Sequence, residues 1–137
     1  MAKDMKDIVK DWFTAWNSHD VNKLAAFYAD DCIYEQVQIG TVCNGKKEFT
    51  ENVSAMFADF PDVKIEQKFT LISENAVCGE VVISGTQAHS SDPAIQATGK
   101  SFSARGAYVS EWQNGITKRH SFYADGMTIM QQLGLMP

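Results

Sequence analysis

Residues 57–72 read FADFPDVKIEQKFTLI, and within this stretch the spacing of the apolar residues changes from helical to extended. Upstream of Pro61, apolar residues recur every three or four positions, which is typical of one face of a helix. Proline disfavours helical geometry at the residue before it, so the helix is predicted to end at Phe60. From Val63 to Leu71, apolar residues alternate with charged or polar ones, which predicts a strand.

Three helices are predicted before this change. The first has apolar residues at helical spacing: Met5, Ile8, Val9, Trp12, Phe13 and Trp16. Asp20 is a good N-cap for a second helix, which we expect to carry Tyr28 on its inner face and to end at residues 29–31. A short strand is predicted to begin at residues 32–35. The third helix follows Gly45 and ends at Phe60.

Strands dominate the chain after residue 62. They are predicted at residues 76–86, at 102–113 and from 116 to about 124, and Asn114-Gly115 is a strong signal for a two-residue turn. With that turn, Gln113 faces Ile116 and His120 faces Val109. Helices first and strands last predict one α+β domain over residues 1–137. In it, three N-terminal helices pack on a curved, mostly antiparallel sheet that encloses a pocket.

Composition and charge narrow the classes of partner. A length of 137 residues fits one domain, and a net charge of −5 with a pI near 5.1 argues against nucleic acid or an anionic membrane as partner. The N-terminal residues contain no long apolar run, so we expect neither a signal peptide nor a membrane anchor. Three cysteines without metal-like spacing favour buried free thiols and a cytoplasmic location.

Several short motifs together resemble a known family. They are Trp16-Asn17-Ser18-His19-Asp20, Tyr28-Ala29-Asp30-Asp31, Phe60-Pro61-Asp62, Gly85-Thr86, Thr98-Gly99-Lys100 and the tail from Asp125 through Gln132-Leu133-Gly134. The chain resembles the SnoaL-like polyketide cyclases, nearly end to end. These proteins belong to the cone-shaped fold shared with nuclear transport factor 2 and ketosteroid isomerase, so the resemblance implies a cone-shaped barrel around a pocket.

The resemblance also implies a chemistry. SnoaL-like cyclases close a polyketide ring by an intramolecular aldol reaction without a metal or an organic cofactor, and an aspartate near the end of the last strand is their proposed general acid/base. Aligned on the Gln-Leu-Gly tail, that residue is Asp125, and His120 is the second catalytic candidate. A carboxyl group in an apolar cavity has a raised pKa, so we expect Asp125 to be buried. Strict alternation puts it on the other strand face from His120, unless a bulge intervenes or the strand ends at Ala124.

The expected ligand is a small, largely apolar molecule. Its predicted binding residues are Trp12, Trp16, Tyr34, Gln36, Gln87, Tyr108 and Phe122. A ketosteroid isomerase would need a tyrosine, a basic aspartate and a protonated aspartate where this chain has Trp12, Gln36 and Tyr108, so that activity is disfavoured. SnoaL-like chains often have histidine after Gly-Thr in the middle strand, where this chain has Gln87.

A non-catalytic ligand-binding or association domain is the competing interpretation, because one fold hosts many functions. The position of Asp125 separates the two classes, since an inert binding protein needs no buried carboxyl group there. We also expect a homodimer formed through the convex face of the sheet. Residues 77–83 are apolar on both strand faces, and the helices can cover only one of those faces.

Overall fold

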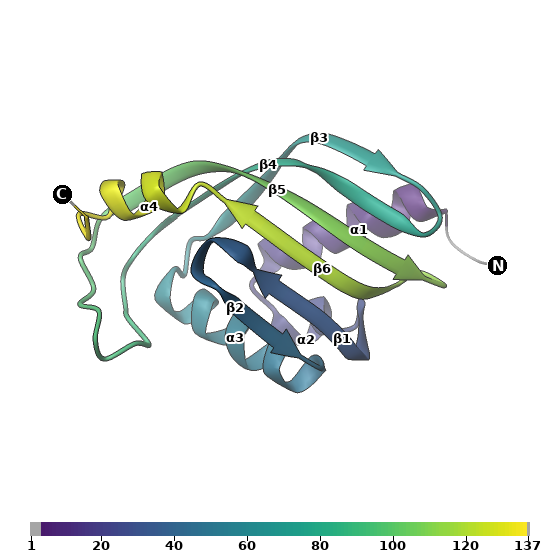
Figure 1. Cartoon of the computed structure of the whole chain (residues 1–137), viewed down its shortest axis with the longest axis horizontal. Helices are drawn as coiled ribbons and strands as arrows, with labels where there is room; N and C mark the ends of the chain where they lie inside the picture. Colours follow the sequence, from purple (N-terminus) through teal and green to yellow (C-terminus); the bar gives the residue numbers. More distant parts are fainter. Residues whose placement is uncertain (1–3, 137) are drawn as a thin grey trace.

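The computed structural model describes residues 4–136, and these residues form an α+β arrangement of helices on one curved sheet (Figure 1). The helices are α1 (Met5–Ser18), α2 (Val21–Ala25), α3 (Lys46–Asp59) and α4 (Gly126–Gln132), with a short 3-10 helix η1 (Val37–Ile39). The strands are β1 (Tyr28–Gln36), β2 (Thr41–Asn44), β3 (Lys64–Ile72), β4 (Ala76–Thr86), β5 (Ser101–Gln113) and β6 (Ile116–Ala124).

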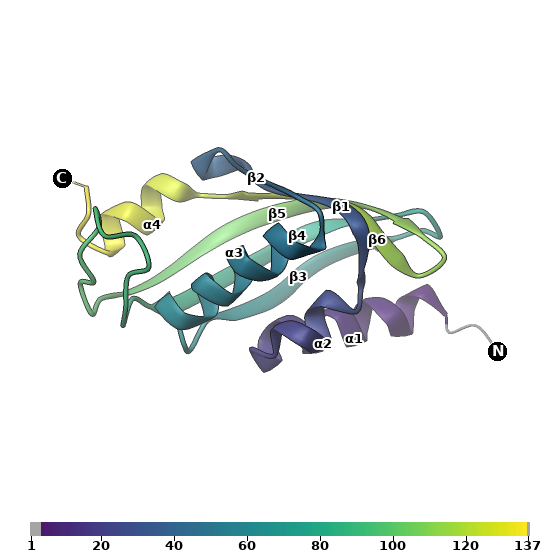
Figure 2. The same ribbon diagram turned by 90° about the horizontal axis from the view of Figure 1, so that it is seen from below.

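The six strands lie in the order β2-β1-β6-β5-β4-β3, and the sheet does not close. Neighbouring strands are antiparallel except β1 and β6, which are parallel. Helices α1, α2 and α3 lie on one side of the curved sheet, and α4 lies at one end of it (Figure 2). The predicted α+β fold, with three N-terminal helices on a mostly antiparallel sheet, is therefore confirmed.

Helix α1 supplies three aromatic side chains of the core, Trp12, Phe13 and Trp16. Asp4 caps it by accepting a hydrogen bond from the backbone N–H of Lys6, at 3.2 Å. Trp12 is 1 % exposed and packs edge to face on Trp112 and Tyr108, with ring centroids 5.0 and 5.6 Å away. Truncating such a side chain to alanine costs about 3–5 kcal/mol, so this helix is held by burial rather than by its caps.

The chain around Tyr28 differs from the prediction. Asp20 caps α2 as predicted, but the helix ends at Ala25, and Tyr28 opens β1 instead of lying on a helix. The backbone N–H of Thr117 donates to the carbonyl of Phe27, and Tyr28 then pairs with Thr117 across the parallel β1–β6 ladder. This tertiary pairing outweighs the local helical spacing. Strand β2 and helix α4 were also not predicted, because both are short and depend on such packing.

Two β-bulges set which side chains face the cavity. In β3 the register shifts between Gln67 and Phe69, so Phe69 and Leu71 turn away from the helices and are 58 % and 56 % exposed. The predicted alternation had placed them with Val63 and Ile65, and that part of the prediction is wrong. One extra residue moves every later side chain to the other face of the strand.

The second bulge lies in the last hairpin, whose turn at Asn114-Gly115 is confirmed. Gln113 faces Ile116 as predicted, but the register shifts before Arg119. His120 therefore faces Ser110, and the predicted pairing with Val109 is wrong. Because Ser110 lies on the buried face of β5, this register directs His120 toward the helices.

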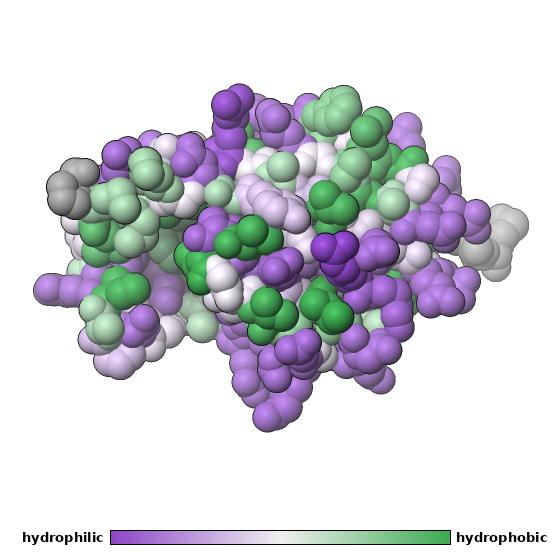
Figure 3. All heavy atoms as spheres, in the orientation of Figure 1, coloured by the Kyte–Doolittle hydropathy of each residue, from purple (hydrophilic) through white to green (hydrophobic). Residues whose placement is uncertain are grey.

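The outer face of the sheet carries exposed apolar side chains. They are Ile33, Val42, Phe69, Leu71, Val109 and Tyr123, each at least 43 % exposed. In the orientation of Figure 1, apolar and polar residues are interspersed over this face (Figure 3). Within the described residues, no helix of the chain covers it.

Candidate functional site

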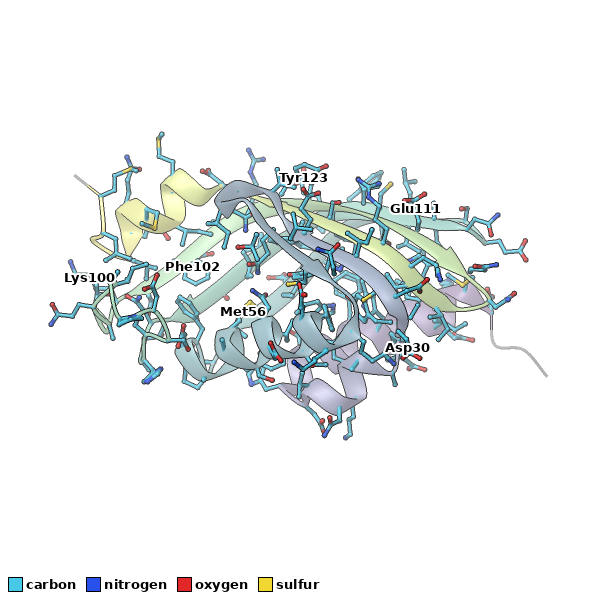
Figure 4. The ribbon with its side chains drawn as sticks, turned by 60° about the horizontal axis from the view of Figure 1, so that its bottom comes forward. Asp30, Met56, Lys100, Phe102, Glu111 and Tyr123 are labelled. Atoms are coloured by element: carbon cyan, nitrogen blue, oxygen red, sulfur yellow. The ribbon has the colours of Figure 1, made fainter. Side chains whose placement is uncertain are left out.

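A cavity of about 900 Å³ lies between the helices and the concave face of the sheet. Met56 on α3 and Phe102 on β5 are part of its wall, while Tyr123 lies on the opposite side of the sheet (Figure 4). At one end, Met127, Ile129 and Met130 of α4 complete the lining. The wall is mainly apolar, which suits a small apolar ligand.

His120 on β6 lies in this wall and is only 4 % exposed. Aromatic rings surround its imidazole with centroid distances from 5.1 to 6.1 Å: Tyr34, Trp12, Tyr108, Trp16 and Tyr28. Burial away from water penalises the charged imidazolium and lowers the pKa of His120 to about 3. The ring is therefore neutral at neutral pH, with one nitrogen that donates and one that accepts.

A buried chain of hydrogen bonds fixes which nitrogen donates. The indole Nε1 of Trp12 donates to the Tyr28 hydroxyl oxygen at 3.1 Å, and that hydroxyl lies 2.9 Å from His120 Nδ1. Indole is a donor only, and Trp16 also donates toward this oxygen, so both acceptor positions of the hydroxyl are filled and its hydrogen is left to donate to Nδ1 of His120. The hydrogen of the neutral ring then lies on Nε2.

The Nε2–H group of His120 is available to a ligand. Within residues 4–136, the one hydrogen bond of the His120 side chain is that to Tyr28, so Nε2 has no protein partner. Burial also raises the pKa of Tyr28 well above its ordinary value, which keeps its hydroxyl protonated as the donor. The site therefore presents an uncharged N–H donor to an apolar cavity.

Most of the residues predicted to bind the ligand do lie in the cavity wall. These are Trp12, Trp16, Tyr34, Gln36, Tyr108 and Phe122. The amide of Gln36 donates to the Tyr34 hydroxyl at 3.3 Å, and burial raises the pKa of Tyr34. Burial likewise raises the pKa of Tyr108 to about 12, although the nearby Thr70 opposes the shift. Both phenols are neutral at physiological pH.

Gln87 does not line the cavity, and its predicted place there is wrong. Its side-chain oxygen accepts hydrogen bonds from the backbone N–H and the hydroxyl of Thr98, at 3.1 and 2.9 Å. Its backbone bonds to Gly99 and Lys100 across the same loop. Gln87 therefore stabilises the loop between β4 and β5. The prediction had extended the alternating strand face to this residue, which lies just beyond the end of β4.

Asp125 is also placed differently from the prediction. Strand β6 ends at Ala124, as one alternative required, but Asp125 is exposed and caps α4. Its carboxylate accepts hydrogen bonds from Thr128 Oγ1 at 2.7 Å and Thr128 N at 3.1 Å. These bonds lower the pKa of Asp125, where a buried acid/base would have a raised one. The expected buried carboxyl group is therefore wrong, and with it the structural basis for Asp125 as general acid/base.

Sequence reasoning missed three residues of this region. Tyr28 was assigned to a helix, so its contact with His120 could not be foreseen. Asn52 lines the cavity, and its position three residues after Phe49 and four before Met56 was the available signal. Asp59 also lines the cavity and accepts hydrogen bonds from Ser91 Oγ at 2.7 Å and from His89 Nδ1 at 3.0 Å, which hold the loop over the end of α3.

Other kinds of site find no support in the described part of the chain. Among residues 4–136, no group of three or more His, Cys, Asp or Glu side chains is arranged to hold a metal ion. No helix in that range is long and apolar enough to cross a membrane. Cys32 and Cys43 are buried free thiols, as predicted, and Cys78 is a half-buried one.

The fold resembles many solved structures. IdmH, a proposed polyketide cyclase from Streptomyces antibioticus, superposes with a TM-score of 0.80 at 21 % identity over 96 % of this chain and 99 % of its own. A proposed polyketide cyclase from Xanthomonas campestris gives 0.83 at 20 % identity over 94 % and 96 % of the two chains. A protein from Catenulispora acidiphila with a ketosteroid isomerase-like fold, solved in complex with trimethylamine, gives 0.80 at 20 % identity over 95 % and 93 %.

Sequence identities of this size show a shared fold only. The family is shown by the match between this sequence and a family model. None of the curated proteins compared with the chain matches it. The family model described as SnoaL-like polyketide cyclase matches residues 6–133, which is nearly the whole chain. The chain therefore belongs to the SnoaL-like polyketide cyclase family.

Proposed function

We propose that the cavity binds a small, largely apolar molecule whose carbonyl oxygen accepts a hydrogen bond from Nε2–H of His120. The observation that carries this proposal is the unpaired N–H of a neutral, buried imidazole in the wall of a cavity of about 900 Å³. The Nε2–H group opens onto the cavity, and a ligand acceptor there forms a hydrogen bond worth about 0.5–1.5 kcal/mol. The aromatic rings around it supply apolar contact area for the rest of the ligand.

The charges of the wall favour a neutral ligand over an anionic one. Among the described residues that line the cavity, the ionisable carboxylates are Asp59 and Asp92, and no lysine or arginine is present. Burial raises the pKa of Asp59, but the hydrogen bonds from His89 and Ser91 outweigh it and leave that pKa lowered. The carboxylate is therefore ionised at neutral pH, and it repels a ligand acid.

Family membership favours a second candidate function, cofactor-free cyclisation. A neutral imidazole donor in an apolar site can stabilise the enolate that forms from a bound ketone. The reaction also needs a base. Asp125 is exposed to solvent outside the cavity wall, so it cannot act as that base. Asp59 is in the wall, but its lowered pKa makes it a weak base. Ligand binding is therefore the function that this geometry supports best.

A matched pair of bicyclic probes tests the binding proposal. α-Tetralone is a neutral ketone, and tetralin is the same bicyclic skeleton without the carbonyl group. Titration monitored by the fluorescence of Trp12 and Trp16, both in the wall, should show the ketone binding about tenfold tighter. His120→Phe should remove that difference and keep the binding of tetralin. Equal affinities in the wild type, or no saturable change with either probe, would contradict the proposal.

Tyr28→Phe tests whether the hydroxyl group orients His120. The change keeps the ring, which stacks on Phe49 with centroids 4.0 Å apart, but leaves Trp12 Nε1 and His120 Nδ1 unpaired. We expect a loss of about 1–3 kcal/mol in the free energy of unfolding and a smaller preference for α-tetralone over tetralin. Tyr34→Phe is the control, because its hydroxyl does not contact His120 through a hydrogen bond. Equal ketone preference in both variants would contradict the assigned tautomer.

Enolisation separates the two candidate functions without knowledge of the natural substrate. If the protein catalyses it, α-tetralone in deuterated water should exchange the hydrogens next to its carbonyl faster with wild type than with His120→Phe, as measured by NMR. A binding protein should give the same exchange rate in both cases.

We also propose where the protein is located in the cell and how its copies assemble, as expected from the sequence. The three free thiols fit a reducing compartment, and we place the protein in the cytoplasm. We also propose a homodimer whose two sheets pack through their outer faces.

A further inference from the structure

Asn52 lies in the cavity wall on α3, and its amide has no hydrogen-bond partner among residues 4–136. The side-chain oxygen is buried and makes no hydrogen bond among the described residues. Its neighbours along the same helix face are Phe49, which is fully buried, and Met56, which also lines the cavity. An amide in these surroundings is unfavourable unless something outside the chain pairs with it.

Most of the other polar groups of the wall are already paired. Gln36 bonds Tyr34, Gln38 accepts from the backbone of Ala124 at 3.2 Å, and Asp59 accepts from two side chains. Among the described residues, the buried hydroxyl oxygens of Tyr108 and Thr117 also lack a hydrogen-bond partner; Tyr108 lies in the sheet side of the wall, and Thr117 is not in the wall. The open positions for a ligand are therefore Asn52 on α3, and Nε2 of His120 and the Tyr108 hydroxyl on the sheet.

We propose that Asn52 is a specificity-determining residue that binds a hydroxyl group of the ligand. His120 belongs to the sheet and Asn52 to α3, which covers the concave face of that sheet (Figure 2). Two anchors on facing walls fix the orientation of a ligand as well as its position. This inference rests on the proposed function, because His120 supplies the first anchor.

A hydroxyl group fits Asn52 in either orientation of its amide. It can donate to the amide oxygen or accept from the amide N–H, and it can do so without bringing a charge into the cavity. A carboxylate would face the ionised Asp59 in the same wall. The ligand class is therefore a neutral, mostly apolar ketone with a hydroxyl group on the side facing α3.

The test compares α-tetralone with its isomers that carry one phenolic hydroxyl group and with the methyl ethers of those isomers. Binding is followed by tryptophan fluorescence. One positional isomer should bind about tenfold tighter than both α-tetralone and its own methyl ether. Asn52→Leu should remove this gain and keep the affinity for α-tetralone. Ser54→Leu, an exposed position on the same helix, should retain the gain.

Unfolding by urea checks the fold of each variant. Asn52→Leu should be at least as stable as wild type, because the amide it removes has no partner. The role of Asn52 is wrong if no isomer shows the gain, or if the gain survives in Asn52→Leu. The proposed function still stands in either case when His120→Phe loses its preference for ketones. If α-tetralone does not bind to the wild type, both fail.

Discussion

The imidazole of His120 contacts aromatic rings on several sides and has one hydrogen bond, to the hydroxyl of Tyr28. Each part of this arrangement has a separate cause. The rings exclude water and keep the imidazole neutral, Tyr28 determines which nitrogen carries the hydrogen, and the bulge before Arg119 determines the face. A uniquely oriented donor in an apolar cavity follows from the three together.

The pH dependence of stability tests the neutral state of His120. Its pKa is lowered from 6.5 in the unfolded chain to about 3 in the folded one. Between these values the unfolded chain binds a proton that the folded chain rejects, so this stabilisation is complete above the unfolded pKa and falls as the pH decreases toward 3. The slope from this one group is up to about 1.4 kcal/mol per pH unit.

Urea unfolding across this interval measures the effect, and His120→Phe is the comparison. The variant keeps all other titrating groups, so its free energy of unfolding should fall less steeply with decreasing pH than that of the wild type. Equal slopes for the two proteins would show that folding does not lower the pKa of His120.

At the residue scale, the sequence located the aromatic wall but not its polar chemistry. Trp12 and Trp16 follow from helical spacing, which is a local property that periodicity reports well. The role of Tyr28 depends on a contact with His120 across 92 positions of the chain, and no local pattern encodes such a contact. Asp125 was misplaced because an aspartate before a glycine can end a strand or cap a helix, and the sequence supports both.

At the scale of helices and strands, local signals predicted the regular segments and missed the irregular ones. Strand β4 has its predicted bounds, and α3 begins after Gly45 as predicted and ends at Asp59, one residue before the predicted end at Phe60. The bulge between Gln67 and Phe69 has no counterpart in the apolar pattern, since alternation continues through it. Bulges depend on pairing with a neighbouring strand, and that partner is not visible in the segment itself.

Helix α4 supports a prediction at this scale. Asp125→Ala removes the cap at Thr128 and should lower the melting temperature by about 2–5 °C, while Asp125→Asn retains a capping oxygen and should lower it less. Neither variant should change the affinity for α-tetralone by more than a small factor, because this carboxylate is outside the cavity wall. Loss of ketone binding in Asp125→Asn with intact folding would restore a role for Asp125 in the site.

At the scale of the whole molecule, the sheet has one covered face and one open face. The cavity occupies the covered face, and the open face presents apolar side chains that include Phe69, Leu71 and Val109. Packing of two such faces removes this apolar area from water, and a stable interface needs about 800 Å² from each partner. The predicted dimer is therefore isologous, with the same patch on both copies.

Sedimentation at micromolar concentration tests this assembly. The wild type should sediment as a dimer, and the double variant Phe69→Lys, Leu71→Lys should sediment as a folded monomer. Ile95→Lys is the control, because Ile95 is an exposed apolar residue in the loop between β4 and β5, outside the sheet. A monomeric wild type, or a double variant that remains dimeric, would contradict an interface on this face.

NMR of protein labelled with ¹⁵N in its histidines measures the tautomer of His120 directly. We expect a neutral ring at neutral pH, with the hydrogen on Nε2 and an accepting Nδ1. The Nε2–H signal should shift when α-tetralone is added and should not shift in this way with tetralin. A protonated ring, a hydrogen on Nδ1, or an Nε2–H signal that does not shift when α-tetralone is added would contradict the proposed role of His120.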